Sequence, residues 1–137
     1  MEARSELHRA LLALINSSDA PKLLHQAASV IPDSAVALDE LAWVFATHPN
    51  DELRDGHEAV RLAEHACTLS KRTNPLLLAT LASAYAETGN FSEAINTIQE
   101  SISKARSSSD QDSIALDEKL LGFFQSNQPI RQDPTSR

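Results

Sequence analysis

The stretch Leu81-Ala-Ser-Ala-Tyr-Ala-Glu-Thr-Gly-Asn-Phe-Ser-Glu-Ala94 decides the fold of this chain of 137 residues. Before its glycine, apolar and small residues recur three and four positions apart, as they do on one face of an α-helix. Gly89 suits the left-handed backbone that ends many helices, and Asn90 or Ser92 can cap the helix that follows. The stretch therefore predicts two helices joined by a tight turn.

The same spacing recurs along the chain. First-helix positions are Leu78, Leu81, Ala82 and Tyr85 in the last copy, and Leu38, Leu41, Ala42 and Phe45 in the copy before it. Second-helix positions are Ala94, Ile98 and Ser101, then Ala59, Ala63 and Ala66, and in the earliest copy Ala20, Leu24, Ala27 and Pro32. The small residues let two helices approach closely, and the larger ones fill the seam between them.

The first helix of the earliest copy is degenerate, with Arg4, Leu7, His8 and Leu11 at the corresponding positions. His8 stands where the pattern prefers a small residue. We expect this helix either to pack differently from the others or to be exposed.

This pattern resembles the tetratricopeptide repeat (TPR) family, most strongly over 75–101 and well over 35–71. The long turn Thr47–Asp55 and the run Leu41–Pro49 are similar to TPR segments found near the C-termini of larger bacterial proteins. The resemblance implies an all-α fold, in which antiparallel helix-turn-helix repeats stack into a right-handed superhelix. It also implies a scaffold for protein–protein interaction.

We predict about seven helices, at residues 3–16, 19–31, 34–48, 55–71, 75–88, 92–106 and 111–126. They would form a single TPR-like domain, 1–126, with a degenerate repeat 1–34, repeats 35–74 and 75–108, and a C-terminal capping helix 111–126. Residues 127–137 contain two prolines, and we expect them to form a flexible tail.

Composition narrows the possible partners. The net charge is −7, and no basic stripe is present, so we expect neither nucleic acid nor an anionic membrane as a partner. No signal peptide or membrane-spanning run is apparent in the sequence. The only cysteine, Cys67, has no partner for an internal disulfide, which slightly favours the cytoplasm and leaves the compartment open.

No catalytic, metal or cofactor motif is evident, and we expect the protein not to be an enzyme. His57-Glu58 lacks a second histidine at the position where a zinc motif needs one, because Arg61 stands there. Cys67 is interpreted as a structural thiol. The adjacent pairs Asp39-Glu40, Asp51-Glu52 and Asp117-Glu118 are interpreted as solvated helix faces.

In TPR proteins the first helices of successive repeats line a concave groove. The resemblance places the following residues in that groove: Val36, Asp39, Trp43, Ala46, Thr47, Leu76, Ala79, Ser83, Ala86 and Glu87. The groove is apolar at its centre and lacks the basic residues with which some TPR proteins clamp acidic tails. A hydrophobic peptide or protein segment fits it better.

Two alternatives remain open at the level of the sequence. Trp43 is either buried beneath the preceding helix or an aromatic anchor for a partner. The protein is either a peptide-binding scaffold or a homo-oligomer that associates through a terminal helix. Groove binding would depend on Trp43 and Leu76, whereas self-association would depend on Leu7, Leu11, Phe123 or Phe124.

Overall fold

The computed structural model describes residues 2–131, with side chains from Glu6 onward. Within this range the chain forms seven α-helices and no strand. The helices are α1 (Glu2–Ile15), α2 (Ala20–Val30), α3 (Ala35–Thr47), α4 (Gly56–Leu69), α5 (Pro75–Glu87), α6 (Phe91–Ser107) and α7 (Gln111–Gln125). Each boundary lies within two residues of its predicted position, so the predicted all-α class is confirmed.

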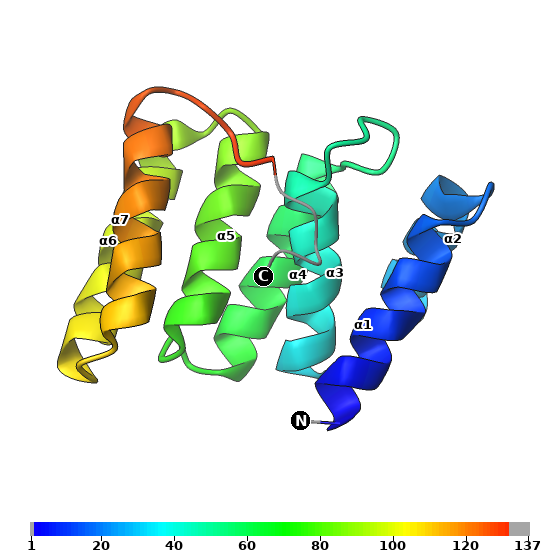
Figure 1. The fold of residues 1–137 in the computed structure, drawn as a ribbon, viewed down its shortest axis with the longest axis horizontal. Helices are drawn as coiled ribbons and strands as arrows, with labels where there is room; N and C mark the ends of the chain where they lie inside the picture. The colour runs from blue at the N-terminus through cyan, green and yellow to red at the C-terminus, as the bar shows by residue number, and fades with distance from the viewer. Residues whose placement is uncertain (1, 132–137) are drawn as a thin grey trace.

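The helices are arranged in two layers (Figure 1). Helices α1, α3, α5 and α7 lie side by side in one layer, and α2, α4 and α6 lie behind them. Helices α1 and α2 contact each other, as do successive helices from α3 to α7, and α5 contacts both α3 and α7 within its layer. One surface of the front layer is therefore formed by successive odd-numbered helices.

Short polar side chains cap the starts of helices α3 to α7. Asp55 accepts a hydrogen bond from the backbone N–H of Glu58, and Asn90 accepts one from Glu93, as expected of N-caps. Ser34, Asn74 and Asp110 cap α3, α5 and α7 in the same way. Gly89 has φ +82°, which confirms the left-handed helix end predicted for it.

The repeat positions form the seam between the layers. All first-helix and second-helix positions of the two later copies are buried, apart from Tyr85, which is half-buried. In α2 the buried residues are Ala20, Leu24 and Ala28. Ala27 is half-buried and packs against the same hydrophobic cluster, and Pro32, the expected closing proline, lies two residues past the end of α2.

The degenerate first helix packs onto the rest of the domain. Leu11 of α1 is buried in the same cluster as Leu24 and Phe45. His8 Nδ1 lies 3.4 Å from Oε2 of Glu40 on α3. The histidine that breaks the repeat pattern thus contacts an acidic side chain of the next repeat.

The long turn between α3 and α4 is organised around Arg54. Its Nη1 donates to the carbonyl oxygens of His48 and Pro49, at 2.7 and 3.1 Å. Its guanidinium also pairs with Asp51 and, across to α5, with Glu87 at 3.2 Å. The adjacent Leu53 is buried in the core. The turn is therefore held both by the polar contacts of Arg54 and by the apolar packing of Leu53.

After α7 the chain turns back toward the middle of the front layer (Figure 1). Asn127 adopts φ +57°, and the N–H of Gln128 donates to the carbonyl oxygen of Phe123 at 2.9 Å. Ile130 is then buried, with only 2% of its surface exposed. The first part of the segment expected to be a flexible tail therefore packs on the helices, and residues 132–137 of that segment lie outside the described residues.

Candidate binding face

The residues predicted to line a groove occupy different environments. Asp39, Trp43, Ala46, Thr47, Ala79, Ser83 and Ala86 are buried, Leu76 and Glu87 are half-buried, and Val36 is 41% exposed. We use the term α3–α5 face for the surface carrying Trp43, Thr47, Ala79, Ala86 and Glu87. Val36 and Leu76 lie outside both hydrophobic clusters of the core.

Trp43 links this face to the far end of the chain. It is 5% exposed and belongs to the same hydrophobic cluster as Ala79, Ala86 and Ile130. Leu11 of α1 belongs to the other cluster. Of the two alternatives left open for Trp43, the described chain shows a buried side chain, but its cluster contains Ile130 of the C-terminal segment and no residue of α1.

The hydroxyl groups near the centre of the face bond within their own helices. Thr47 Oγ1 donates to the carbonyl oxygen of Trp43 at 2.7 Å, and Ser83 Oγ donates to that of Ala79 at 2.9 Å. In each of these bonds the hydroxyl donates its hydrogen to a carbonyl oxygen one turn back in the same helix. The side chains of Trp43, Ala79 and Ala86 provide the apolar part of the face.

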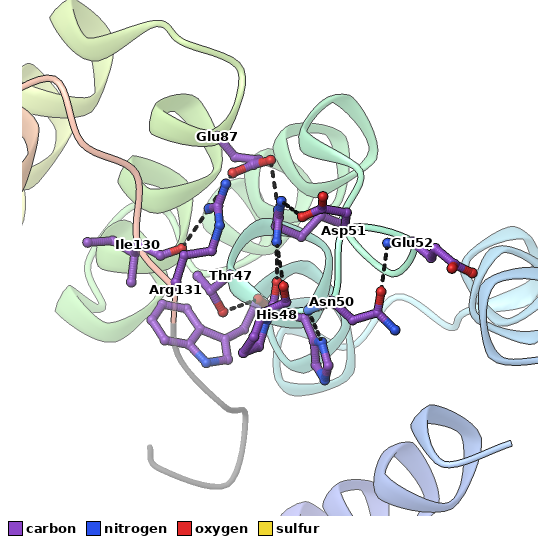
Figure 2. A network of polar contacts seen from close by, with 11 residues as sticks. Thr47, His48, Asn50, Asp51, Glu52, Glu87, Ile130 and Arg131 are labelled. Atoms are coloured by element: carbon purple, nitrogen blue, oxygen red, sulfur yellow. Dashed lines mark hydrogen bonds and ion pairs between the residues drawn. The ribbon is translucent and has the colours of Figure 1, made fainter.

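Glu87 supplies charge at the rim of the face. Its Oε1 lies 2.6 Å from Nη1 of Arg131, and its Oε2 lies 3.2 Å from Nε of Arg54 (Figure 2). Figure 2 shows Thr47, Ile130 and Arg131 gathered beside Glu87. One carboxylate therefore joins the α3–α4 turn, the end of α5 and the C-terminal segment.

The interpretation of the adjacent carboxylates as solvated is wrong for three residues. Asp39, Glu40 and Asp117 are buried, whereas the pair Asp51-Glu52 and Glu118 are exposed. Neighbouring residues point about 100° apart on a helix, as its ~3.6 residues per turn require, so one of a pair can face inward. In α3 both members are covered, because that helix has neighbours on several sides.

Asp117 forms a polar cluster that the sequence did not reveal. Its Oδ2 lies 2.6 Å from Ser101 Oγ of α6, which lies 2.9 Å from the carbonyl oxygen of Pro75 at the start of α5. Burial raises the pKa of Asp117 to about 6. The cluster ties three helices together and binds a proton more tightly than a free carboxylate does.

The remaining chemically reactive residues are dispersed. Cys67 is buried, and burial raises the pKa of its thiol to about 12, so the thiol is protonated at neutral pH. His65 Nε2 lies 3.3 Å from Asp33, and His57 is exposed. Among the side chains described, from Glu6 to Arg131, no three His, Cys, Asp or Glu groups converge in a way that would hold a metal ion.

The described helices include none with both the length and the apolar character needed to cross a membrane. The fold defines an all-helical protein built of two helical layers around an aliphatic core. Compared with known proteins, the chain matches no family model, no curated protein and no solved structure.

Proposed function

We propose that the protein is a non-catalytic, TPR-like interaction module that binds a peptide or protein segment on the α3–α5 face. The observation that carries the proposal is the clustering of Trp43 from α3 with Ala79 and Ala86 from α5. These residues come from two different helices. They are also among the residues that the TPR resemblance assigns to a ligand-binding groove.

The chemistry of this face suits a peptide. An indole beside small alanine side chains offers a flat apolar contact, and aromatic residues are frequent anchors in protein interfaces. Glu87 adds a negative charge at the rim, which favours a partner that carries a cation nearby. The net charge of −7 disfavours nucleic acid as the partner.

Selection of displayed random peptides on the intact protein tests this proposal. Selected peptides should lose at least tenfold in affinity for the Leu76→Glu and Val36→Glu variants, because these two accessible residues of the predicted groove lie on α5 and α3, the helices that carry the α3–α5 face. Leu69→Glu is the matched control, because Leu69 is also exposed but belongs to α4 in the other layer. Equal binding to all three variants would place the binding site elsewhere.

A second candidate function, self-association through α7, is favoured by two exposed side chains. Leu116 and Phe123 are 40% and 38% exposed, and their spacing of two helical turns places them on one side of α7. Phe123 also lines a surface pocket with Lys119, Gly122, Ser126 and Gln128. Apolar groups of this kind often mark contacts between copies.

Light scattering over a concentration series distinguishes this second function. A mass that stays near 14.9 kDa at all concentrations would argue against it. A dimer that dissociates on Phe123→Glu but persists in Leu69→Glu would make self-association through α7 the leading function.

A further inference from the structure

The segment after α7 contacts the α3–α5 face through two consecutive side chains. Ile130 is 2% exposed and shares a hydrophobic cluster with Trp43, Ala79 and Ala86. Arg131 donates from Nη1 to Oε1 of Glu87 at 2.6 Å (Figure 2). An aliphatic group and a cation thus meet the apolar centre and the acidic rim of the same face.

The residues between α7 and Ile130 contribute little to this contact. Ser126, Asn127 and Gln128 are exposed, and Pro129 is half-buried. Residues 128–131 form no helix, so this part of the segment lies on the helices in an irregular conformation. Among residues 126–131, the attachment therefore depends on Ile130 and Arg131 and not on a repeat of the helical packing.

We propose that the α3–α5 face recognises a non-helical segment carrying an aliphatic side chain followed directly by a cationic one. The pair Ile130-Arg131 is its internal ligand, and a partner of the same chemistry binds by replacing it. This inference rests on the proposed function and adds to it the class of ligand and a competitor within the chain.

The covalent attachment of Ile130-Arg131 to the rest of the chain determines how strongly this pair competes with a free peptide. A ligand joined to its site by a short linker has an effective concentration on the order of millimolar. A free peptide at micromolar concentration therefore displaces Ile130-Arg131 poorly, and a variant whose internal segment is released should bind such a peptide much better. Trp43 is the only tryptophan of the chain, so its fluorescence reports directly on the face.

The test compares the full chain with its Ile130→Asp variant. The probe is a labelled synthetic peptide with the sequence of residues 126–131, and binding is measured by fluorescence anisotropy. The variant should bind the probe at least tenfold more tightly than the wild-type chain does. Its Trp43 emission should shift to longer wavelength and return when the probe is added.

Gln128→Asp is the matched control, because it introduces the same charge at an exposed position of the same segment. It should bind the probe as weakly as the wild-type chain. A probe with aspartate in place of its isoleucine, or glutamate in place of its arginine, should bind neither protein. If circular dichroism shows that Ile130→Asp unfolds, Arg131→Glu serves as the releasing variant, with the same expected order of affinities.

Equal probe binding by the wild-type chain and the releasing variant, or unchanged Trp43 emission, would overturn this inference. In that case display-selected peptides that still depend on Leu76 would leave the proposed function standing. A face that binds neither the probe nor any selected peptide would overturn both. A doubled mass of the wild-type chain that is lost in Ile130→Asp but persists in Phe123→Glu would show that copies exchange the segment, and this would also overturn the inference.

Discussion

His25 of α2 and Asp55 at the start of α4 are joined by a contact of 2.9 Å between Nε2 and Oδ2. The Nδ1 atom of the same ring lies 2.9 Å from the carbonyl oxygen of Pro21. Both partners accept hydrogen bonds, so the two bonds form together only when both ring nitrogens carry a hydrogen, as they do in the imidazolium form. Because Asp55 also caps α4 through Glu58, the charge on one histidine links the first hairpin to the second.

This contact predicts a pH-dependent contribution to stability. The pKa of His25 is raised by its hydrogen bonds to Asp55 and to Pro21. The contribution is therefore fully present below pH 6.5 and is lost as the pH rises through the raised pKa. Since His25 is half exposed, His25→Gln should cost only about 0.5 kcal/mol at pH 5.5 and less at pH 8.5, as measured by urea unfolding.

Asp55→Asn provides the complementary change, because asparagine still caps a helix but carries no charge. It should remove the same pH dependence, and the double variant His25→Gln/Asp55→Asn should lose no more than either single variant. Additive losses would show that the two side chains act independently.

Asp117→Asn should stabilise the protein above pH 6. Burial raises the pKa of Asp117 to about 6 from its usual 3.8, so the free energy of unfolding falls as the pH rises between these values. An asparagine resembles the protonated acid and can donate to Ser101. The gain should be about 1–3 kcal/mol at pH 8 and vanish below pH 4. Glu118→Gln, the exposed neighbour, should change nothing; a gain there equal to that of Asp117→Asn would refute the explanation.

Two glycines should respond oppositely to alanine. A Cβ at either Gly89 or Gly122 would meet no atom within 4 Å, so only backbone preference matters. Gly89 has φ +82°, and Gly89→Ala should destabilise by about 1 kcal/mol. Gly122 lies within α7, and Gly122→Ala should stabilise by about 0.5–1 kcal/mol. Thermal unfolding of both variants checks the pair, and a shift in the same direction for both would contradict this account.

Arg54→Lys should destabilise by about 1–2 kcal/mol, because lysine cannot bond the two carbonyl oxygens and Glu87 together as the guanidinium does. Arg61→Lys is the control, since Arg61 is exposed and its ion pair within the described residues is with Glu58, one turn away. Its cost should be within about 0.5 kcal/mol. Chemical denaturation measures both, and equal losses would show that the fork geometry of Arg54 is unimportant.

The helices could be predicted from the sequence because their signals are local. The spacing of small and large residues fixed the buried sides of α3 to α6, and Asp55, Asn90 and Gly89 marked ends that the structure places at the same residues. These features depend on neighbours within one or two turns of the chain.

The contacts that shape the α3–α5 face could not be predicted in this way. Arg131 and Glu87 are separated by 44 residues, and no periodic pattern precedes Ile130. The burial of Asp117 was missed for a related reason, since it depends on how α7 is rotated against α6. The residues expected in the groove were chosen from their positions in the repeat. The segment after α7 has no position in the repeat, so its place beside them could not be predicted.

The buried thiol of Cys67 allows the rate of local opening in the middle of the domain to be measured directly. Alkylating reagents attack a thiolate in contact with solvent, and this group is both covered and protonated in the folded chain. Its labelling rate in native buffer therefore measures how often α4 separates from its neighbours. The one cysteine of the sequence thus reports the rate of local opening without an engineered label.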